Sequence, residues 1–331
     1  MSLDHALPVV FMALMGLSML AYVVLDGFDL GVGLLMPRAT DAEQDVMVAS
    51  IGPFWDANET WLVLGVGILL VAFPKAHGMV LSTLYLPVTL MLIGLVLRGV
   101  AFDFCIKARA VHKPLWNRAF FAGSAIAALA QGWMLGSYIT GLEPGWVYKL
   151  FSAFIAVALA TAYMLLGATW LVMKTEGALQ ERALAWAKIA WPLVVIGMGL
   201  ISMATPWVSE LVRERWFSLP AFIALLPIPL TTALLLLVTR LMLSSRATRG
   251  PLCWLPFALL IGVFVLAFLG LAYSIYPFVV IDKLTLWQAA SSPATLKVVL
   301  VGVIVTIPMI FAYTVFTYRV FRGKASELTY G

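Results

Sequence analysis

Long apolar stretches are the feature that most constrains this chain. Of its 331 residues 63% are hydrophobic and only 11% are charged, and the mean hydropathy is +1.02. Water-soluble proteins carry about 25% charged residues, whereas a stretch of about 20 apolar residues can cross the roughly 30 Å of hydrocarbon in a bilayer. Because such stretches recur along the whole chain, we predict an all-α, polytopic membrane protein.

The apolar stretches place about nine transmembrane helices in a single integral-membrane domain with short connections. The predicted spans are 7–36, 51–73, 79–104, 118–140, 147–173, 187–207, 217–243, 254–278 and 296–320. Most of the 21 Lys and Arg residues fall in connections on one side, and such residues concentrate on the cytoplasmic side of membranes. The N-terminus is therefore predicted outside and the C-terminus in the cytoplasm. Basic residues scattered over short loops also speak against a nucleic-acid partner.

Charged side chains occur at and within the first three predicted spans, where they are costly. A charge at the bilayer centre costs roughly 2.5–3.5 kcal/mol on insertion scales. In the predicted orientation, with a rise of about 1.5 Å per residue, these side chains lie within roughly 15 Å of the cytoplasmic edge. Such a cluster is expected to handle protons, ions or a polar ligand. Its members are Asp26, Asp29, Asp56, Glu59, Arg98 and Asp103.

The acids of the first two spans are paired at helical spacing. Asp26 and Asp29 are three residues apart, as are Asp56 and Glu59, so each pair shares one face of its helix. Two neighbouring carboxylates in a low dielectric are not both ionised, so one of them can carry a proton near neutral pH. Arg98 supplies a counter-charge, and the sequence leaves its partner open. The cluster is either a proton entrance from the cytoplasm or an ion-pair network that fixes helix register.

Small and aromatic residues flank these acids. Gly27 and Gly31 form a small-xxx-small pair, with Gly33 following, and this spacing predicts close packing of the first helix on a neighbour. Trp55 and Trp61 fall near the predicted cytoplasmic interface, where tryptophan is common. Either tryptophan could instead line a pocket for an aromatic head group.

The sequence does not indicate a haem or metal site in this chain alone. The histidines His5, His77 and His112 all fall in predicted tails or loops, whereas haem in a bilayer uses axial ligands inside the bundle. The two cysteines, Cys105 and Cys253, cannot build a disulfide framework or a cysteine metal site. We therefore expect neither haem nor metal to be bound by this chain without a partner.

Several motifs resemble a known family. The stretch 25–33 (LDGFDLGVG) resembles the first-helix signature of subunit II of the cytochrome bd-type quinol oxidases, and the chain looks closer to their cyanide-insensitive branch. The stretch 52–61 (GPFWDANETW) is similar to the second-helix signature, and 98–103 (RGVAFD) to the end of the third helix. Near the C-terminus, 276–278 (YPF) and 287–292 (WQAASS) resemble the loop before the last helix.

The resemblance implies a nine-helix subunit with two four-helix bundles, about 7–140 and 147–278, plus a peripheral helix at about 296–320. It also implies a haem-bearing subunit I as partner, in a complex that oxidises ubiquinol or another quinol and reduces oxygen to water. The implied location is the bacterial cytoplasmic (inner) membrane. Subunit II of this family carries no haem ligands, supports its partner and supplies part of a cytoplasmic proton route. A small accessory membrane subunit and membrane lipid complete the expected partners.

The resemblance also assigns roles to residues. Asp29 and Asp56 match the family's proton-route positions, whereas Glu59 stands where other members have glutamine. The expected proton route comprises Asp29, Asp56, Asp26, Glu59, Arg98 and Asp103. Some members hold a structural quinone in this subunit. The candidates for its pocket are Trp55, Trp61, Asp29 and Arg98.

A stand-alone proton-coupled secondary transporter is the alternative function. Transporters place their binding residues near the bilayer midplane, whereas the charges here are predicted close to one face of the membrane. A second alternative is a purely structural subunit whose acids only anchor helices. Co-purification of a haem-bearing partner would exclude the first alternative, and the turnover of Asp29 and Asp56 variants would test the second.

Overall fold

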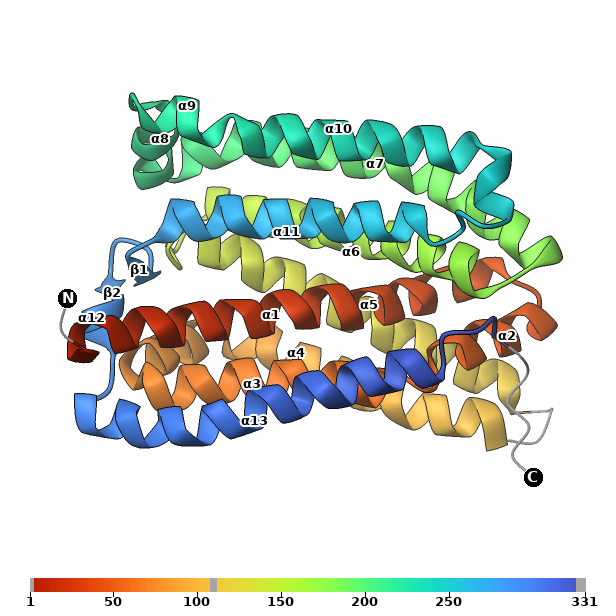
Figure 1. Ribbon diagram of the computed structural model, residues 1–331, viewed down its shortest axis with the longest axis horizontal. Helices are drawn as coiled ribbons and strands as arrows, with labels where there is room; N and C mark the ends of the chain where they lie inside the picture. The colour runs from red at the N-terminus through yellow and green to blue at the C-terminus, as the bar shows by residue number, and fades with distance from the viewer. Residues whose placement is uncertain (1–2, 108–111, 326–331) are drawn as a thin grey trace.

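The computed structural model describes residues 3–107 and 112–325, and within these ranges nine helices are long and apolar enough to cross a membrane. They run side by side along the longest axis of the molecule (Figure 1). This confirms the predicted all-α polytopic class. The spanning helices are α1 (Leu3–Leu35), α3 (Trp55–Ala72), α4 (Pro74–Lys107), α5 (Lys113–Ile139), α6 (Trp146–Lys174), α7 (Gly177–Val208), α10 (Pro227–Ser244), α11 (Leu255–Ile275) and α13 (Pro293–Val320).

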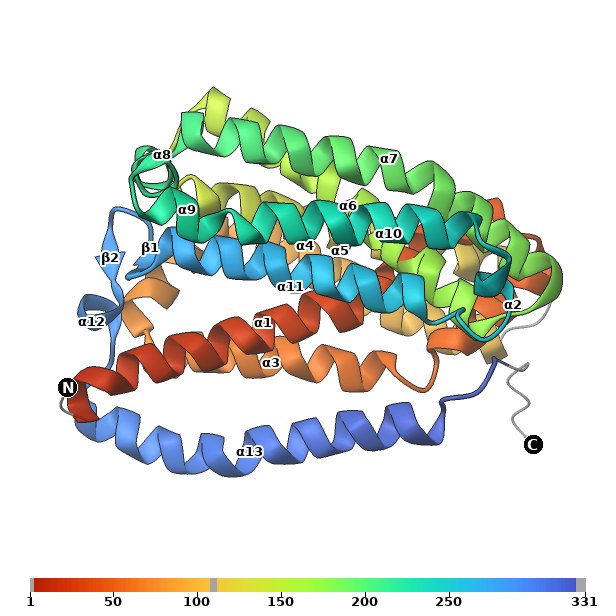
Figure 2. The same cartoon turned by 45° about the horizontal axis from the view of Figure 1, so that its top comes forward.

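The long helices form two groups of four and one outlier. Helices α1, α3, α4 and α5 make one bundle, α6, α7, α10 and α11 make the other, and α1 packs against α6 where the bundles meet. Helix α13 lies at the edge beside α3, and most of its surface is exposed (Figure 2). Two bundles and a peripheral helix are the arrangement that the family resemblance implied.

Short elements that the apolar pattern did not predict lie between the spans or, for residues 221–225, within a predicted span. They lie mostly at the two ends of the long helices, as Figure 1 shows. Helix α3 begins at Trp55, later than the predicted residue 51, because a separate short helix precedes it. The short elements are η1 (Met36–Arg38), α2 (Asp41–Ile51), α8 (Glu210–Phe217), α9 (Ala221–Leu225), η2 (Arg246–Arg249), the antiparallel strands β1 (Phe278–Val280) and β2 (Leu284–Thr285), and α12 (Leu286–Ala289).

Helix α2 forms because local signals start it in a polar stretch. Thr40 and Glu43 make a capping box, in which the Thr40 N–H donates to Glu43 Oε2 at 2.8 Å. The first turns are polar and the last residues, 47–51, are buried. Hydropathy alone misses such a helix, since only its second half is apolar.

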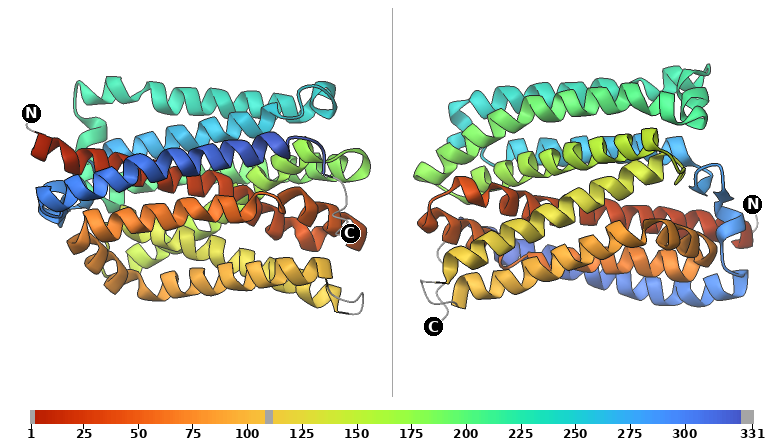
Figure 3. Two further views of the ribbon diagram at one scale, coloured as in Figure 1. Left: turned by 60° about the horizontal axis from the view of Figure 1, so that its bottom comes forward. Right: turned by 180° about the vertical axis from the view of Figure 1, so that it is seen from behind.

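Close helix crossings join the two bundles and hold the first one together around its charged residues. A Cβ at Gly31 would lie 1.8 Å from the carbonyl oxygen of Tyr163, so α1 and α6 touch through backbone. A Cβ at Gly123 on α5 would lie 2.6 Å from Gly94 O and 2.7 Å from Arg98 N on α4. Helices α4 and α5 run together on the back of the molecule (Figure 3). The second crossing therefore fixes where Arg98 enters the bundle.

Candidate functional site

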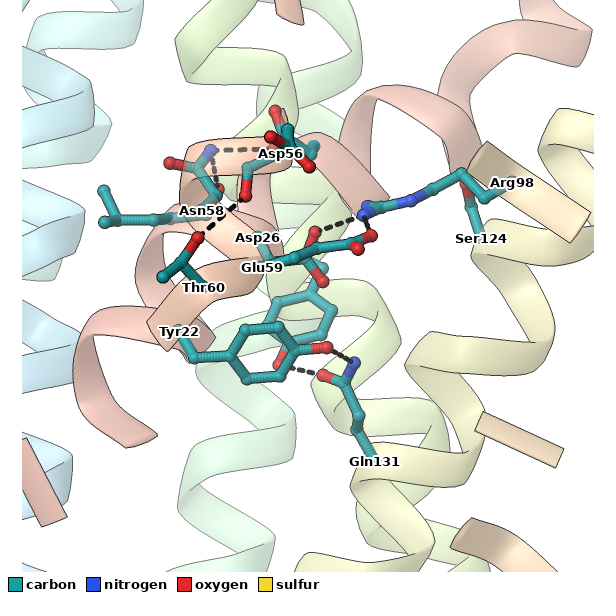
Figure 4. Close-up of polar contacts among 12 residues, drawn as sticks. Tyr22, Asp26, Asp56, Asn58, Glu59, Thr60, Arg98, Ser124 and Gln131 are labelled. Carbon is teal, nitrogen blue, oxygen red and sulfur yellow. Dashed lines mark hydrogen bonds and ion pairs between the residues drawn. The ribbon is translucent and has the colours of Figure 1, made fainter. Parts of the chain in front are cut away.

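The centre of the site is Arg98 of α4, which binds two acids from different helices. Its Nη2 lies 2.6 Å from Asp26 Oδ1 on α1 and 2.5 Å from Glu59 Oε1 on α3 (Figure 4). The side chains of Arg98 and Asp26 are 2% and 1% exposed, whereas that of Glu59 is 26% exposed. The structure thus names the partners of Arg98 that the sequence left open, and Glu59 is the member of this trio that reaches the surface.

The second acid of α1, Asp29, is held by an amide. Asp29 is 0% exposed, and its Oδ2 accepts a hydrogen bond from Asn58 Nδ2 at 2.8 Å. Asn58 in turn accepts a hydrogen bond from the hydroxyl of Tyr318 on α13, at 3.1 Å. A buried carboxylate with this support extends the charged cluster toward the peripheral helix.

A chain of buried polar side chains leads from Asp26 into the first bundle. The Tyr163 hydroxyl on α6 donates to Gln131 Oε1 on α5 at 2.7 Å. Gln131 Nε2 in turn donates to the Tyr22 hydroxyl on α1, also at 2.7 Å (Figure 4). The Tyr22 side chain interacts with the Asp26 carboxylate one turn along the same helix. The polar region therefore continues past the ion pair, where apolar packing would otherwise be expected.

The buried cluster has an excess of negative charge. With Asp26, Asp29 and Glu59 all ionised, the single guanidinium of Arg98 would leave two negative charges uncompensated in an apolar bundle. Uncompensated buried charge is costly. Both Asp26 oxygens and Asp29 Oδ1 accept no hydrogen bond of good geometry from the described residues. The arrangement therefore favours a bound proton among these carboxyl groups.

Asp56 and Asp103 lie apart from this buried cluster. Both are exposed, whereas Asp26, Asp29 and Arg98 are buried. Asp56 stands in the first turn of α3, where a negative charge favours the helix N-terminus, and its carbonyl oxygen accepts a hydrogen bond from Thr60. Four of the six predicted residues thus come together, and the other two lie nearer the surface.

The candidates for a quinone pocket have different neighbours in the described part of the chain. Trp55 and Arg98 border a common void that is too narrow to admit a water molecule. Trp61 points elsewhere, and its Nε1 donates to Thr314 Oγ1 on α13 at 3.2 Å. Asp29 faces Asn58 on another side of the site. Within the described residues, no group of three or more His, Cys, Asp or Glu side chains is placed to hold a metal ion.

The predicted glycines lie at the contacts that bring these groups together. A Cβ at Gly27 would lie 2.7 Å from the Tyr163 ring, and one at Gly33 would lie 2.1 Å from Ser124 Oγ. Because Gly27 lies between the two acids of α1, its missing side chain lets Tyr163 approach and reach Gln131. The glycine spacing and the polar chain are therefore parts of one arrangement.

Aromatic rings and the C-terminal segment cover the site at the end where α6 and α13 finish. Phe54 stacks near Tyr318 with ring centroids 4.6 Å apart, and the Trp170 ring lies against both. Lys174 Nζ donates to Phe321 O and to Gly323 O, at 2.5 and 2.9 Å, and so ties the segment after α13 to α6. These rings pack beside Tyr318, whose hydroxyl reaches the Asn58 side chain that holds Asp29.

Sequence reasoning missed the uncharged members of the site. Asn58, Tyr22, Gln131, Tyr163 and Tyr318 carry no charge, so they do not stand out from composition. A signal was present for Asn58, which lies between two acids in the GPFWDANETW motif, and for Gln131, which interrupts an apolar run. Tyrosines within spans give no such signal, because their rings also suit an apolar core.

Comparison with known proteins places this chain in a family. The family model described as cytochrome bd terminal oxidase subunit II matches residues 7–321. Cytochrome bd-I ubiquinol oxidase subunit 2 of Escherichia coli (strain K12) is 27% identical, over 98% of this chain and 96% of the relative. Cytochrome bd ubiquinol oxidase subunit 2 of Bacillus subtilis (strain 168) is 25% identical, over 95% of each.

A solved structure shares the fold. A chain in the structure of bd oxidase from Geobacillus thermodenitrificans superposes with a TM-score of 0.75 at 17% identity, covering 96% of this chain and 98% of that one. Since the family match extends over nearly the whole chain, the alternative of a stand-alone transporter is not supported. The chain belongs to the cytochrome bd terminal oxidase subunit II family, and is a membrane subunit of a quinol oxidase complex.

Proposed function

We propose that this chain is the haem-free subunit II of a bacterial inner-membrane complex in which a haem-bearing subunit I oxidises ubiquinol and reduces oxygen. Within that complex it carries part of the path by which protons reach the oxygen site from the cytoplasm. The ubiquinol substrate is supported by the names of the Escherichia coli and Bacillus subtilis relatives. The haems belong to the partner, since the resemblance assigns subunit II no haem ligands.

The observation that carries the proton role is the packing of three carboxyl groups around one buried guanidinium. Reduction of oxygen to water consumes protons, so the complex needs groups that take up and release them in the membrane. Glu59 reaches the surface, and Arg98 links it to the fully buried Asp26. A proton entering at Glu59 would therefore pass to Asp26 or Asp29 without leaving the cluster. Asp56 and Asp103, which lie nearer the surface, would gather protons for it.

The quinol is oxidised on the partner in this proposal. The void beside Trp55 and Arg98 admits no water molecule. A structural quinone would need these side chains to move apart. A small accessory subunit and bound lipid would lie against the exposed apolar faces of the spanning helices.

The partnership is tested by affinity purification of the tagged chain in mild detergent. A visible spectrum and identification of the companion proteins are the measurements. We expect haem bands and a second large membrane subunit in the same peak. A colourless chain that purifies alone would overturn the assignment.

The proton role is tested by removing single carboxyl charges in the purified complex. Asp29→Asn is expected to slow oxygen consumption by about tenfold or more, because a positioned acid or base contributes at least a hundredfold where it is essential. Asp56→Asn should lower the rate less, since its exposed carboxylate can be bypassed by water. Haem content should stay unchanged in both.

Asp282→Asn is the matched control for these variants. Asp282 is exposed at the opposite end of the helices, and its φ of 57° is a conformation that asparagine adopts readily. If Asp29→Asn turns over as fast as Asp282→Asn between about pH 6 and 8, the carboxyl cluster is structural and the proton role is wrong.

A further inference from the structure

Asn58 joins three helices at Asp29. Its Nδ2 donates to Leu25 O at 3.1 Å and to Asp29 Oδ2 at 2.8 Å, both on α1. Its Oδ1 accepts from the hydroxyl of Tyr318 on α13 at 3.1 Å. Asn58 itself lies on α3 and is 0% exposed. Both N–H groups and the oxygen of this buried amide are therefore engaged.

The neighbours of Asn58 allow only one orientation of its amide. A backbone carbonyl can only accept, so the Asn58 nitrogen must face Leu25 O. The second N–H group then points to Asp29 Oδ2, which must accept. Asp29 Oδ1 is equally buried but accepts no hydrogen bond from the described residues. The two oxygens of Asp29 are therefore unequal: one is held as an acceptor and the other is free to carry a proton.

Tyr318 is placed by contacts along one face of the peripheral helix. Its ring lies 4.6 Å from that of Phe54 and 6.1 Å from that of Trp170, measured between centroids. About one turn away on the same helix, Thr314 accepts a hydrogen bond from Trp61 of α3. Since most of α13 faces away from the bundles, these contacts aim the Tyr318 hydroxyl at Asn58.

We propose that Asn58 is a positioning residue that keeps Asp29 Oδ2 as an acceptor and directs the proton carried by Asp29 to Oδ1, with Tyr318 of α13 acting through Asn58. The inference rests on the proposed proton role of Asp29 and deepens it. It gives α13 a part in the proton path, although no acid of that path lies on this helix.

The test uses the purified oxidase complex and two readouts. The first is the pH profile of oxygen consumption. The second is the infrared difference spectrum between oxidised and reduced complex, in which the carboxylic C=O band lost in Asp29→Asn reports Asp29. The variants are Tyr318→Phe, Asn58→Leu and their double variant. Tyr138→Phe is the matched control, because Tyr138 is also a partly buried tyrosine, whose hydroxyl donates to Val279 O at 2.6 Å far from the cluster.

In Tyr318→Phe the ring packing stays, so the complex should assemble with unchanged haem content. We expect the alkaline limb of the pH profile to move to higher pH by about half a unit, as loss of one relayed hydrogen bond to a carboxylate predicts. Asn58→Leu should move the alkaline limb further. The infrared band of Asp29 should shift in both Tyr318→Phe and Asn58→Leu. The double variant should match Asn58→Leu alone, because Tyr318 has no route to Asp29 once the amide is gone.

Failure of this inference is distinguishable from failure of the proton role. In one outcome Asp29→Asn slows turnover, but Tyr318→Phe and Asn58→Leu have the same pH profile and the same Asp29 band as the control Tyr138→Phe. The inference about Asn58 is then wrong, whereas the proton role stands. If the effects of Tyr318→Phe and Asn58→Leu add in the double variant, Tyr318 does not act through Asn58. If Asp29→Asn changes neither turnover nor any carboxylic band, both proposals fall.

Discussion

Arg98 is the residue on which the buried charges depend most directly. It lies 2.6 Å from Asp26 and 2.5 Å from Glu59, and its own exposure is 2%. A guanidinium can serve two carboxylates at once because its donors are fixed in one plane. Without it, the buried Asp26 and the partly buried Glu59 would lose the guanidinium that both of them contact.

The first prediction concerns this charge. Arg98→Gln is expected to destabilise the purified complex by about 3–5 kcal/mol, because breaking a buried ion pair leaves uncompensated charge. The measurement is thermal unfolding followed by loss of the haem spectrum. Adding Asp26→Asn to Arg98→Gln should restore part of the lost stability, since the unpaired Asp26 carboxylate is then removed.

An exposed ion pair provides the comparison. Arg213 pairs with Glu210 at 2.6 Å on α8, with the two side chains 55% and 73% exposed. Arg213→Gln should cost less than about 1 kcal/mol. Equal losses of stability in Arg98→Gln and Arg213→Gln would contradict the argument that burial makes the Arg98 ion pair important for stability.

The charged part of the site was predictable and its pairing was not. Asp26, Asp29 and Arg98 stand out because charges are rare in apolar runs. Which acid Arg98 binds depends on helix rotation and on side-chain rotamers, and spacing along one helix does not determine these. The exposure of Asp56 likewise follows from where α3 begins, which hydropathy located only to within several residues.

Among the elements, α1 and α6 approach each other through their backbones. Gly31 and Gly167 lie at this crossing, where a Cβ on Gly167 would lie 2.5 Å from the carbonyl carbon of Gly31. In membranes, small residues let backbones approach because no hydrophobic force drives the helices together. The glycine spacing therefore predicted a close crossing, but not that α6 would be the partner.

The second prediction tests this crossing. Gly31→Ala should destabilise the complex by about 1–3 kcal/mol or prevent its assembly, because the new methyl group meets the Tyr163 carbonyl oxygen rather than a side chain that can turn away. Gly67→Ala on α3 is the control, since a Cβ there has nothing within 4 Å. It should be neutral or stabilising by up to about 1 kcal/mol.

Helix boundaries show the limit of apolar pattern at the element scale. Helix α7 begins at Gly177, well before the predicted residue 187. Hydropathy placed the start too late because the first turns of this helix are polar and precede the apolar run. The predicted span 217–243 is divided, with α9 ending at Leu225 and α10 beginning at Pro227. Proline lacks the N–H that would continue the helix, so Pro227 starts a new one. Polar first turns and a proline therefore move these ends away from the limits of the apolar runs.

At the scale of the whole molecule, polar contacts at one end tie the two bundles together. Arg182 of α7 donates to Glu43 Oε2 of α2 at 2.9 Å. Partial burial acts to raise the pKa of Glu43, but hydrogen bonds from Thr40 and the nearby Arg182 guanidinium hold it below its ordinary value. Glu43 therefore stabilises the folded state when it is ionised.

The third prediction follows from the sign of that shift. A group whose pKa is lowered by folding stabilises the folded state fully at pH values above its unfolded-state pKa. This stabilisation is lost as the pH falls through the folded-state pKa. Glu43→Gln should therefore lower the unfolding temperature at pH 7. The difference in unfolding temperature between this variant and the unmodified complex should become smaller below about pH 4. A gap that stays constant over this range would show that Glu43 does not act through its charge.

The contact between Asn58 and Tyr318 also has a consequence for biogenesis. These residues are 260 positions apart in sequence, and a ribosome adding roughly 5–20 residues per second takes on the order of 13–50 s to make the intervening chain. During that interval Asp29 is already in the bilayer while the hydroxyl that orients its neighbour has not been synthesised. The hydrogen-bonded surroundings of Asp29 are therefore completed only after the last helix has been made.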